Sequence, residues 1–324
     1  MKVGFFTTQI NAAASDFYWN GMKLAEEVSF YDPNIDLRQY DIILVMTYDH
    51  QVVKQIKDLS PKTKVGLIDP RNFKVLDSAK ECDFLIVDSI EMEDYWSKLK
   101  KPIHRYVEYP SFNSISKHHQ CSSVTKIGYH GNQIHLKSMS KAVTPALESL
   151  GNSYDIELVV VYNGPPPTGN ESWYPKNVKV THVPWSPGVY EKSLSQCDIG
   201  ISPNRMPFEE EEPFSHDRPN EYNYSPDDYI LRFKMPTNPG RIIVFGKLGI
   251  PVVADFYPSA FQTLNNDRGF VCHSSSAWEK SLKSLIENTD LRNSMSKKLQ
   301  DYVESKFNFE HQNVGLIQFL RTIT

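Results

Sequence analysis

The sequence predicts an α/β protein of two units, each a parallel sheet covered by helices on both faces. Three observations support this prediction. The 324 residues suffice for two domains of ordinary size. Short, continuous apolar runs alternate with amphipathic stretches along almost the whole chain, as expected for parallel strands buried on both sides. A polar, serine-rich segment at 110–123 separates two such series and is interpreted as an interdomain linker.

The first series predicts the sheet of the first unit. A helix is expected at 16–29, because its apolar residues fall on one face, namely Phe17, Gly21, Leu24, Ala25 and Val28. Strands are expected at 2–7, 41–47, 64–69, 82–87 and 103–110.

The second series predicts another sheet and more helices. Strands are expected at 126–131, 156–162, 178–185, 197–202, 251–256 and 268–273. Helices are expected at 137–150, 188–196, 239–248, 275–287, 290–306 and 309–322. A long acidic segment at 204–230 interrupts this series. It is interpreted as a solvated loop, or alternatively as a lid or substrate-binding element, because long loops in compact domains are often functional.

Composition and missing motifs argue against several classes of protein. A formal net charge of −4 disfavours a nucleic-acid partner. The start lacks a signal peptide, and no apolar run approaches the ~18 residues of a membrane-spanning helix, so a cytoplasmic location is expected, with peripheral membrane contact left open. Four scattered cysteines and ten histidines show no metal-binding spacing, so neither a metal nor a cofactor is expected. The glycine-rich dinucleotide fingerprint, the Walker A sequence, the G-x-S-x-G elbow and H-E-x-x-H are also missing.

Four sequence pieces in the second half occur in a telling order: KIGYHGN (126–132), HVPW (182–185), CDIGISPN (197–204) and KMPTNPGRIIVFGKLGIPVVAD (234–255). In this order they resemble the donor-binding domain of GT-B glycosyltransferases. The resemblance covers roughly 124–306, whereas the first 110 residues match only in their alternating pattern. It implies two Rossmann-like domains with a cleft between them, 1–112 and 124–306, and a final helix (309–324) that returns to the first. Because this helix also has apolar positions to cover, we expect 309–322 to contact residues before 110.

The resemblance also implies where a nucleoside diphosphate sugar would bind. The loop holding Gly131 and Asn132 would lie against the donor diphosphate, and a residue near Trp185 beside the nucleotide base. The matching positions of the long fourth piece are Lys234, Pro236, Asn238, Arg241, Gly249 and Pro251. Each piece also has a purely structural interpretation. Gly131 and Asn132 suit a strand-to-helix turn, His130 and Trp185 suit core packing, and Gly249 suits a helix end.

One departure from the family pattern concerns a pair of glutamates carried by many retaining members. Here Pro236 and Val244 occupy those two positions. The usual carboxylate contact to the donor ribose is therefore missing. Retention or inversion at the sugar carbon stays open.

The strongest site prediction from residue chemistry concerns the start of the helix at 239–248. Asn238 is expected to be its N-cap and Pro239 its first residue, which puts Arg241 in the first turn. A cation there opposes the helix dipole, and Lys234 lies just upstream. This arrangement costs stability unless an anion binds or solvent screens the two cations at the surface. The first possibility predicts that Lys234 and Arg241 hold a diphosphate.

In the first unit, ligands are expected at the carboxyl ends of the strands, where the sequence has the 7–16 loop, 48–50, 69–71 and 88–89. Asp16 and His50 are candidates for a general base that takes a proton from an acceptor hydroxyl. Alternatively, Asp16 caps the first helix, and Asp49 or His50 starts the next.

Together these observations predict a metal-independent glycosyltransferase of the hexosyltransferase type. Its partners would be a nucleoside diphosphate sugar and an unknown saccharide or other hydroxyl acceptor. Two alternatives remain: an epimerase of nucleotide sugars on the same fold, and a non-catalytic two-domain binder of nucleotides or sugars.

Overall fold

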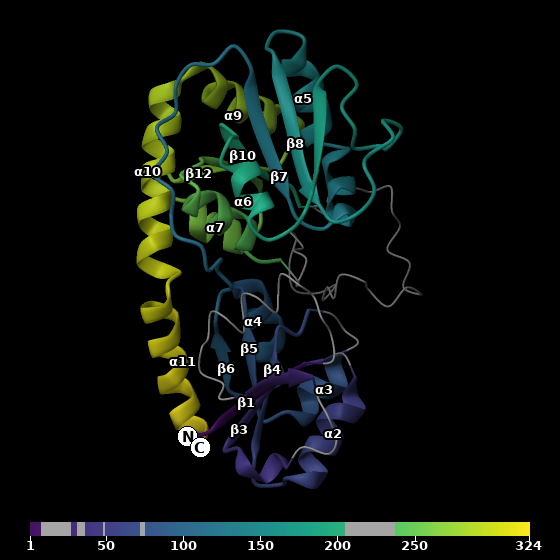
Figure 1. Ribbon diagram of the computed structural model, residues 1–324, viewed down its shortest axis with the longest axis vertical. Coiled ribbons are helices and arrows are strands. Elements are labelled where there is room, and N and C mark those ends of the chain that lie inside the picture. The colour runs from purple at the N-terminus through teal and green to yellow at the C-terminus, as the bar shows by residue number, and fades with distance from the viewer. Residues whose placement is uncertain (8–26, 31–35, 48, 72–74, 205–236) are drawn as a thin grey trace. The chain divides into compact units, whose positions relative to one another are not determined.

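The structure is a computed structural model that describes residues 1–7, 27–30, 36–47, 49–71, 75–204 and 237–324 (Figure 1). Contacts divide these residues into two compact units. The first unit comprises the described residues up to Ser111, together with Thr237, Asn238 and 306–324. The second comprises 112–204 and 239–305.

The first unit is built on a six-stranded sheet of order β2-β1-β3-β4-β5-β6 in which every pair is parallel. β1 pairs with β3 from Val3 opposite Ile42 to Thr7 opposite Met46. The central strands are buried, as the continuous apolar runs predict. The strands are β1 (Val3–Thr7), β2 (Glu27–Phe30), β3 (Ile42–Met46), β4 (Lys64–Ile68), β5 (Phe84–Val87) and β6 (Ile103–Arg105).

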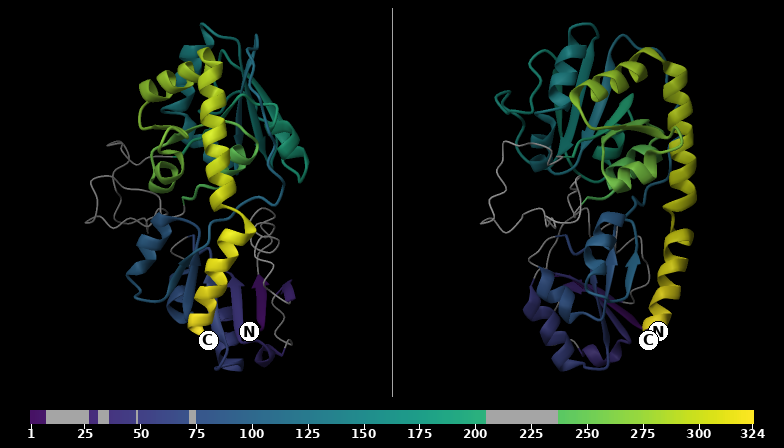
Figure 2. Two further views of the ribbon diagram at one scale, coloured as in Figure 1. Left: turned by 90° about the vertical axis from the view of Figure 1, so that its left-hand side faces the viewer. Right: turned by 180° about the vertical axis from the view of Figure 1, so that it is seen from behind.

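The last helix of the chain, α11 (Phe309–Ile323), packs on this first unit. The Phe319 ring lies 5.6 Å from the Phe84 ring of β5, centroid to centroid. The backbone amide of Val107 donates a 3.1 Å hydrogen bond to Oε1 of Gln312. In Figure 2 the yellow α11 runs beside this sheet in both views, and the expected contact with residues before 110 is confirmed. The other helices are η2 (Leu37–Gln39), α2 (His50–Leu59), α3 (Leu76–Glu81) and α4 (Ile90–Ser97).

The second unit holds a parallel sheet of order β12-β11-β10-β7-β8-β9. Its strands are β7 (Thr125–His130), β8 (Ile156–Tyr162), β9 (Lys179–Pro184), β10 (Ile199–Ser202), β11 (Val252–Asp255) and β12 (Gly269–Cys272). Its helices are η4 (Gln133–Met139), α5 (Val143–Gly151), α6 (Val189–Leu194), α7 (Gly240–Lys247), α8 (Pro258–Leu264), α9 (Ser275–Glu287) and α10 (Thr289–Lys306).

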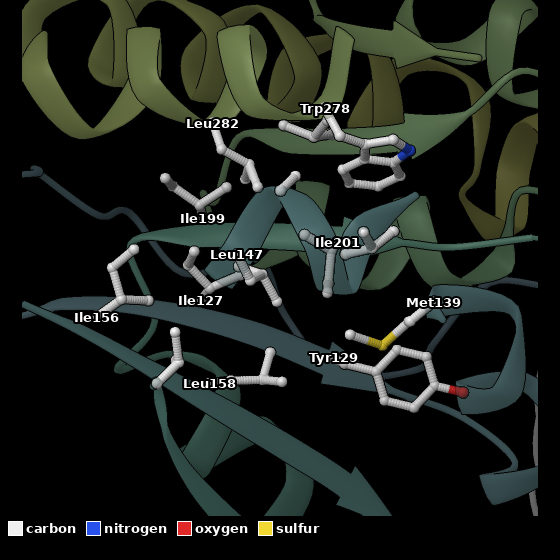
Figure 3. Packing of buried hydrophobic residues seen from close by; sticks show 14 of the residues in the cluster. Ile127, Tyr129, Met139, Leu147, Ile156, Leu158, Ile199, Ile201, Trp278 and Leu282 are labelled. Carbon is white, nitrogen blue, oxygen red and sulfur yellow. The ribbon is translucent and has the colours of Figure 1, made fainter. Parts of the chain in front are cut away.

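The core of the second unit lies between the sheet and its covering helices. Figure 3 shows Trp278 and Leu282 of α9 facing Ile199 and Ile201 of β10, and all four side chains are fully buried. Burying each such side chain stabilises the fold by roughly 1.5–3 kcal/mol. The sheet that positions the candidate site is therefore well supported on this face.

One predicted helix is partly wrong. Residues 27–29 of the helix expected at 16–29 belong to strand β2, which pairs in parallel with β1 from Glu27 opposite Gly4. The rest of that helix lies outside the described residues. The spacing of apolar residues reflects local helical preference only. Pairing with β1 stabilises the edge strand β2 through residues that are distant in sequence, and the local spacing does not show this.

The polar segment after Ser111 has no regular secondary structure, but the second unit holds it at several points. The backbone amide of Ile115 donates to the carbonyl of Lys247 at 2.8 Å. The backbone amide of His119 donates to Oδ1 of Asn293, also at 2.8 Å. From Phe112 onward, this segment is therefore part of the second unit. No helix of the described chain is long and apolar enough to cross a membrane.

Candidate functional site

The topology of the second sheet indicates a candidate ligand site. From β7 the chain proceeds to β8 and β9 on one side, and then returns to β10, β11 and β12 on the other. The loops after β7 and β10 therefore leave their adjacent strands in opposite directions. In open α/β sheets, ligands bind at such a reversal of strand order, beyond the carboxyl ends of the strands.

The loop after β7 is shaped by Gly131. Its φ of 139° is a conformation that L side chains rarely adopt. A Cβ at this position would lie 3.2 Å from the hydroxyl of Tyr129 and 3.4 Å from Cδ of Arg241. The Tyr129 hydroxyl donates a 2.8 Å hydrogen bond to the carbonyl of Asn132 and so fixes the loop. The loop backbone thus lies directly beside Arg241, with no side chain of its own between them.

Helix α7 brings Arg241 to this edge. It packs closely on β10, because Gly200 leaves room for Phe245, and a Cβ there would lie 2.5 Å from the ring. Arg241 lies in the first turn, as predicted, and that turn contains no acidic residue. Its Nη1 donates a 2.9 Å hydrogen bond to the carbonyl of Pro203, in the loop after β10. The guanidinium is therefore held between the two loops of the strand reversal.

The predicted N-cap of α7 is wrong. Pro239, not Asn238, occupies the capping position, and no side chain caps the helix. Asn238 belongs to the first unit, where its Nδ2 donates to Asp88 at 2.7 Å and to Glu108 at 3.3 Å. The Asn238 side chain therefore binds two buried carboxylates and does not cap α7, contrary to the prediction from the sequence pattern. Lys234 lies outside the described residues.

His130 and Trp185 behave mainly as packed aromatic residues. Nε2 of His130 lies 3.3 Å from the carbonyl of Arg241, and its ring meets the Phe245 ring edge-on at 5.2 Å. Burial, with the Arg241 cation beside it, lowers the pKa of His130 to about 3, so the imidazole is neutral at physiological pH. Trp185 follows β9, two strands from β7, and stacks half-buried on Tyr190 with ring centroids 5.7 Å apart.

The sequence analysis missed Asp255, which ends β11 at this same edge of the sheet. Its side chain is buried and accepts hydrogen bonds from the Asn204 amide and from the Trp278 indole. Burial raises its pKa to about 7. The available signal was its position directly after a continuous apolar strand, as for Asp69 and Asp88.

In the first unit, the strand order reverses between β1 and β3. The residues directly after β1, including Asp16, lie outside the described residues. His50 is the first residue of α2, and the preceding Asp49 caps that helix by accepting the Gln51 amide at 2.9 Å. Nε2 of His50 lies 3.9 Å from a carboxylate oxygen of Glu81. His50 is thus at the expected strand end, while Asp49 has the structural role given as the alternative.

Three carboxylates gather around one arginine at the ends of β4, β5 and β6. Arg71 contacts Asp69 at 2.5 Å, Asp88 at 3.0 Å and Glu108 at 3.3 Å. Burial and the neighbouring negative charges raise the pKa of Asp88 well above its usual value, and burial also raises that of Glu108. The sequence marked Asp69, Arg71 and Asp88 as strand ends, but nothing in it joined Glu108 and Asn238 to them.

No family model and no curated protein matches the sequence. Solved structures match its fold, and three illustrate the result. HepE of Anabaena in complex with UDP has a TM-score of 0.65 at 11% identity, covering 99% of this chain and 100% of that one. A glycosyltransferase of Rickettsia africae has 0.62 at 10%, covering 99% and 98%. Sucrose-phosphate synthase of Thermosynechococcus elongatus has 0.61 at 13%, covering 88% and 74%.

The chain has the GT-B fold. The two parallel sheets agree with the expectation drawn from the sequence pieces of the second half. At these identities the similarity establishes the fold, and the chemistry must be argued from the residues. Among the described residues of this GT-B chain, no group of three or more His, Cys, Asp or Glu side chains could hold a metal ion.

Proposed function

We propose that the protein is a glycosyltransferase that moves a sugar, of the hexose type, from a nucleoside diphosphate sugar to an acceptor hydroxyl. The observation that carries the proposal is the placement of Arg241. It lies in the first turn of α7, beside the side-chain-free backbone of Gly131, at the reversal of strand order in the second sheet. The similar fold of HepE, whose structure contains UDP, supports the same assignment.

The arrangement suits a diphosphate for electrostatic reasons. The amides at a helix N-terminus attract anions, and an arginine in the same turn adds a full positive charge. When the bond between sugar and phosphate breaks, negative charge builds up on the leaving diphosphate. Fixed donors aimed at that charge lower the barrier without having to reorganise. Arg241 and the first amides of α7 would supply these donors, and Gly131 would let the β7 loop approach the phosphates.

The remaining site residues are proposed by position. Asn132 would border the diphosphate with Gly131, and Trp185 would lie near the nucleotide base. Lys234 would add a second cation, and Asn238 would hold the chain just before α7. If the enzyme inverts, Asp16 or His50 would take the proton of the acceptor hydroxyl. We further propose that the reaction needs no divalent metal, because the sequence lacks a metal-spaced cluster beside a phosphate-binding loop.

A thermal-shift screen tests the proposal. UDP, GDP and ADP, followed by their sugar conjugates, should be added separately to the protein. A ligand at about 100 times its Kd adds about 2.7 kcal/mol to the free energy of unfolding. At least one nucleoside diphosphate should raise the Tm, and its sugar conjugate should be consumed only when an acceptor is present. A protein that none of these ligands stabilises would contradict the proposal.

One observation favours a non-catalytic binder as a second candidate, beside the alternative of an epimerase. Val244 and Pro236 stand where many retaining members carry glutamates, and Val244 is buried in the core of the second unit. The carboxylate contact to the ribose is therefore not supplied from that position of α7. Product analysis separates the three functions. A transferase forms an acceptor-dependent product, an epimerase converts the donor sugar without an acceptor, and a binder leaves the donor intact.

A further inference from the structure

Asp255 joins two elements at the edge of the second sheet where the donor site is proposed. Its Oδ2 accepts the backbone amide of Asn204, in the loop after β10, at 2.5 Å. Its Oδ1 accepts the indole N–H of Trp278, on α9, at 2.7 Å. The side chain of Trp278 is itself fixed in the core shown in Figure 3. The carboxylate therefore ties the start of the loop after β10 to the buried core of the unit.

The amide that Asp255 binds is one half of a single peptide group. The other half is the carbonyl of Pro203, which accepts the hydrogen bond from Nη1 of Arg241 at 2.9 Å. In a trans peptide the N–H and C=O point in opposite directions, and the chain contains no cis peptide in the described residues. A carboxylate thus lies at one end of this peptide and a guanidinium at the other. Hydrogen bonds in such a chain polarise and strengthen one another.

We propose that Asp255 is a positioning residue for Arg241, which it controls through the peptide between Pro203 and Asn204. By holding the amide, the carboxylate fixes the direction of the Pro203 carbonyl. The carbonyl then holds the guanidinium beside Gly131, where the diphosphate would bind. This inference rests on the proposed function, because it assigns Asp255 to the same donor site.

The alternative is that Asp255 only stabilises the core, and Asp198 offers a matched comparison. Oδ2 of Asp198 accepts the backbone amide of Lys126 at 2.9 Å. Asp198 precedes β10, whereas Asp255 ends β11. Because these strands are parallel, Asp198 lies at the amino ends of the strands and Asp255 at their carboxyl ends. Each of the variants Asp255→Asn and Asp198→Asn therefore changes a carboxylate that accepts a backbone amide. Only Asp255→Asn changes the one that holds the peptide bonded to Arg241.

Titration calorimetry on the full chain tests the proposal, with UDP or the nucleoside diphosphate that stabilises the parent. Losing the preferred orientation of one charged hydrogen-bond donor should weaken binding about 3- to 10-fold in Asp255→Asn. Binding of the uncharged nucleoside should not change. Asp198→Asn should bind the diphosphate like the parent. In an Arg241→Ala background, adding Asp255→Asn should change the affinity less than about 2-fold, since the residue it acts through is gone.

Equal effects of Asp255→Asn in the two backgrounds would overturn the positioning role. So would an equal loss of nucleoside and nucleoside diphosphate affinity. If the parent binds no nucleoside diphosphate, the proposed function fails, and a crystal structure of Asp255→Asn still decides the positioning. An unchanged Arg241 hydrogen bond to Pro203 in that structure would refute it, whereas a turned peptide or a displaced guanidinium would support it.

Discussion

The imidazole ring of His104 on β6 stacks on the phenyl ring of Phe319 on α11, with centroids 5.0 Å apart and planes 22° apart. The contact joins the end of the chain to the edge strand of the first sheet. Burial, with Arg105 nearby, lowers the pKa of His104 to about 4. The imidazole is therefore neutral when the unit is folded at neutral pH.

This relationship predicts acid sensitivity. Because the unfolded chain protonates His104 near its ordinary pKa of about 6.5, the unfolded state binds more protons between pH 6.5 and about 4. Stability contributed by the neutral ring is thus present above pH 6.5 and is lost as the pH falls through this window. His104→Phe should remove that loss, so urea unfolding at pH 7 and pH 4.5 should show a smaller difference for the variant. The exposed His311→Phe is the control and should keep the parent's difference.

Arg241→Ala should weaken binding of the nucleoside diphosphate by about 10- to 150-fold, because a charge-assisted hydrogen bond contributes about 1.5–3 kcal/mol. Arg268→Ala is the control. Arg268 lies in the same unit but directly precedes β12, and is therefore at the amino ends of the strands, whereas the proposed donor site is at their carboxyl ends. Calorimetry on both variants checks the expectation. Parental affinity in Arg241→Ala would show that the donor site is wrongly assigned.

Gly131→Ala should weaken nucleotide binding in addition to lowering the free energy of unfolding. A φ of 139° strains any L side chain, at a cost of about 1–3 kcal/mol, and the new methyl group would lie 3.4 Å from Cδ of Arg241. Gly169→Ala is a matched control, because Gly169 also has a positive φ but no atom within 4 Å of the added Cβ. Both variants should lose stability in chemical unfolding, while only Gly131→Ala should lose affinity for the diphosphate. Equal affinities would contradict the close approach of this loop to the ligand.

Asp88→Asn should change how stability depends on pH. Burial and neighbouring carboxylates raise the pKa of Asp88, so the folded state retains a proton that the unfolded state has released. The contribution of Asp88 to the free energy of unfolding is most favourable below its ordinary pKa of about 4. It declines as the pH rises towards the raised pKa. Relative to Asp88→Asn, the parent should therefore be more stable at pH 4 than at pH 8. The exposed Asp77→Asn should show no such trend in the same unfolding experiment.

Once transfer activity is in hand, a chelator should leave it unchanged. The reason is that Arg241 and helix amides are proposed to neutralise the leaving diphosphate in place of a divalent ion. The measurement is product formation with and without the chelator, followed by addition of Mg²⁺ or Mn²⁺. Loss of activity that either ion restores would overturn the metal-independent mechanism.

Much of the fold was predictable because its strands are continuous apolar runs, which a parallel sheet buried on both faces requires. The strand at Ile156–Tyr162 appears in the structure with the predicted bounds, and so does the amphipathic helix at Ser275–Glu287. Strand β2 was missed because pairing at a sheet edge leaves little trace in local spacing. The position of Arg241 in the first turn was predictable from Asn238 and Pro239, since these residue types are typical of a helix start, although Pro239 and not Asn238 occupies the capping position.

The connections of the site were not predictable in the same way. Asn238 has a good local reason to cap α7, but two carboxylates from β5 and β6, distant in sequence, bind its amide instead. Asp255 is linked to Asn204 across 51 residues. Such hydrogen bonds depend on which strands become neighbours, and the order of strands in a sheet is a property of the whole chain.

The number of residues in the segment that follows Ser111 is constrained by contacts along it. The Ile115 amide binds the end of α7, Lys117 binds the carbonyl of Ser195, and Nε2 of His119 contacts the carbonyl of Gly249 at 2.9 Å. One residue added or removed would put every later partner out of reach. Related chains should therefore differ here in the kinds of amino acid but not in their number, and insertions accumulated during evolution should be found elsewhere.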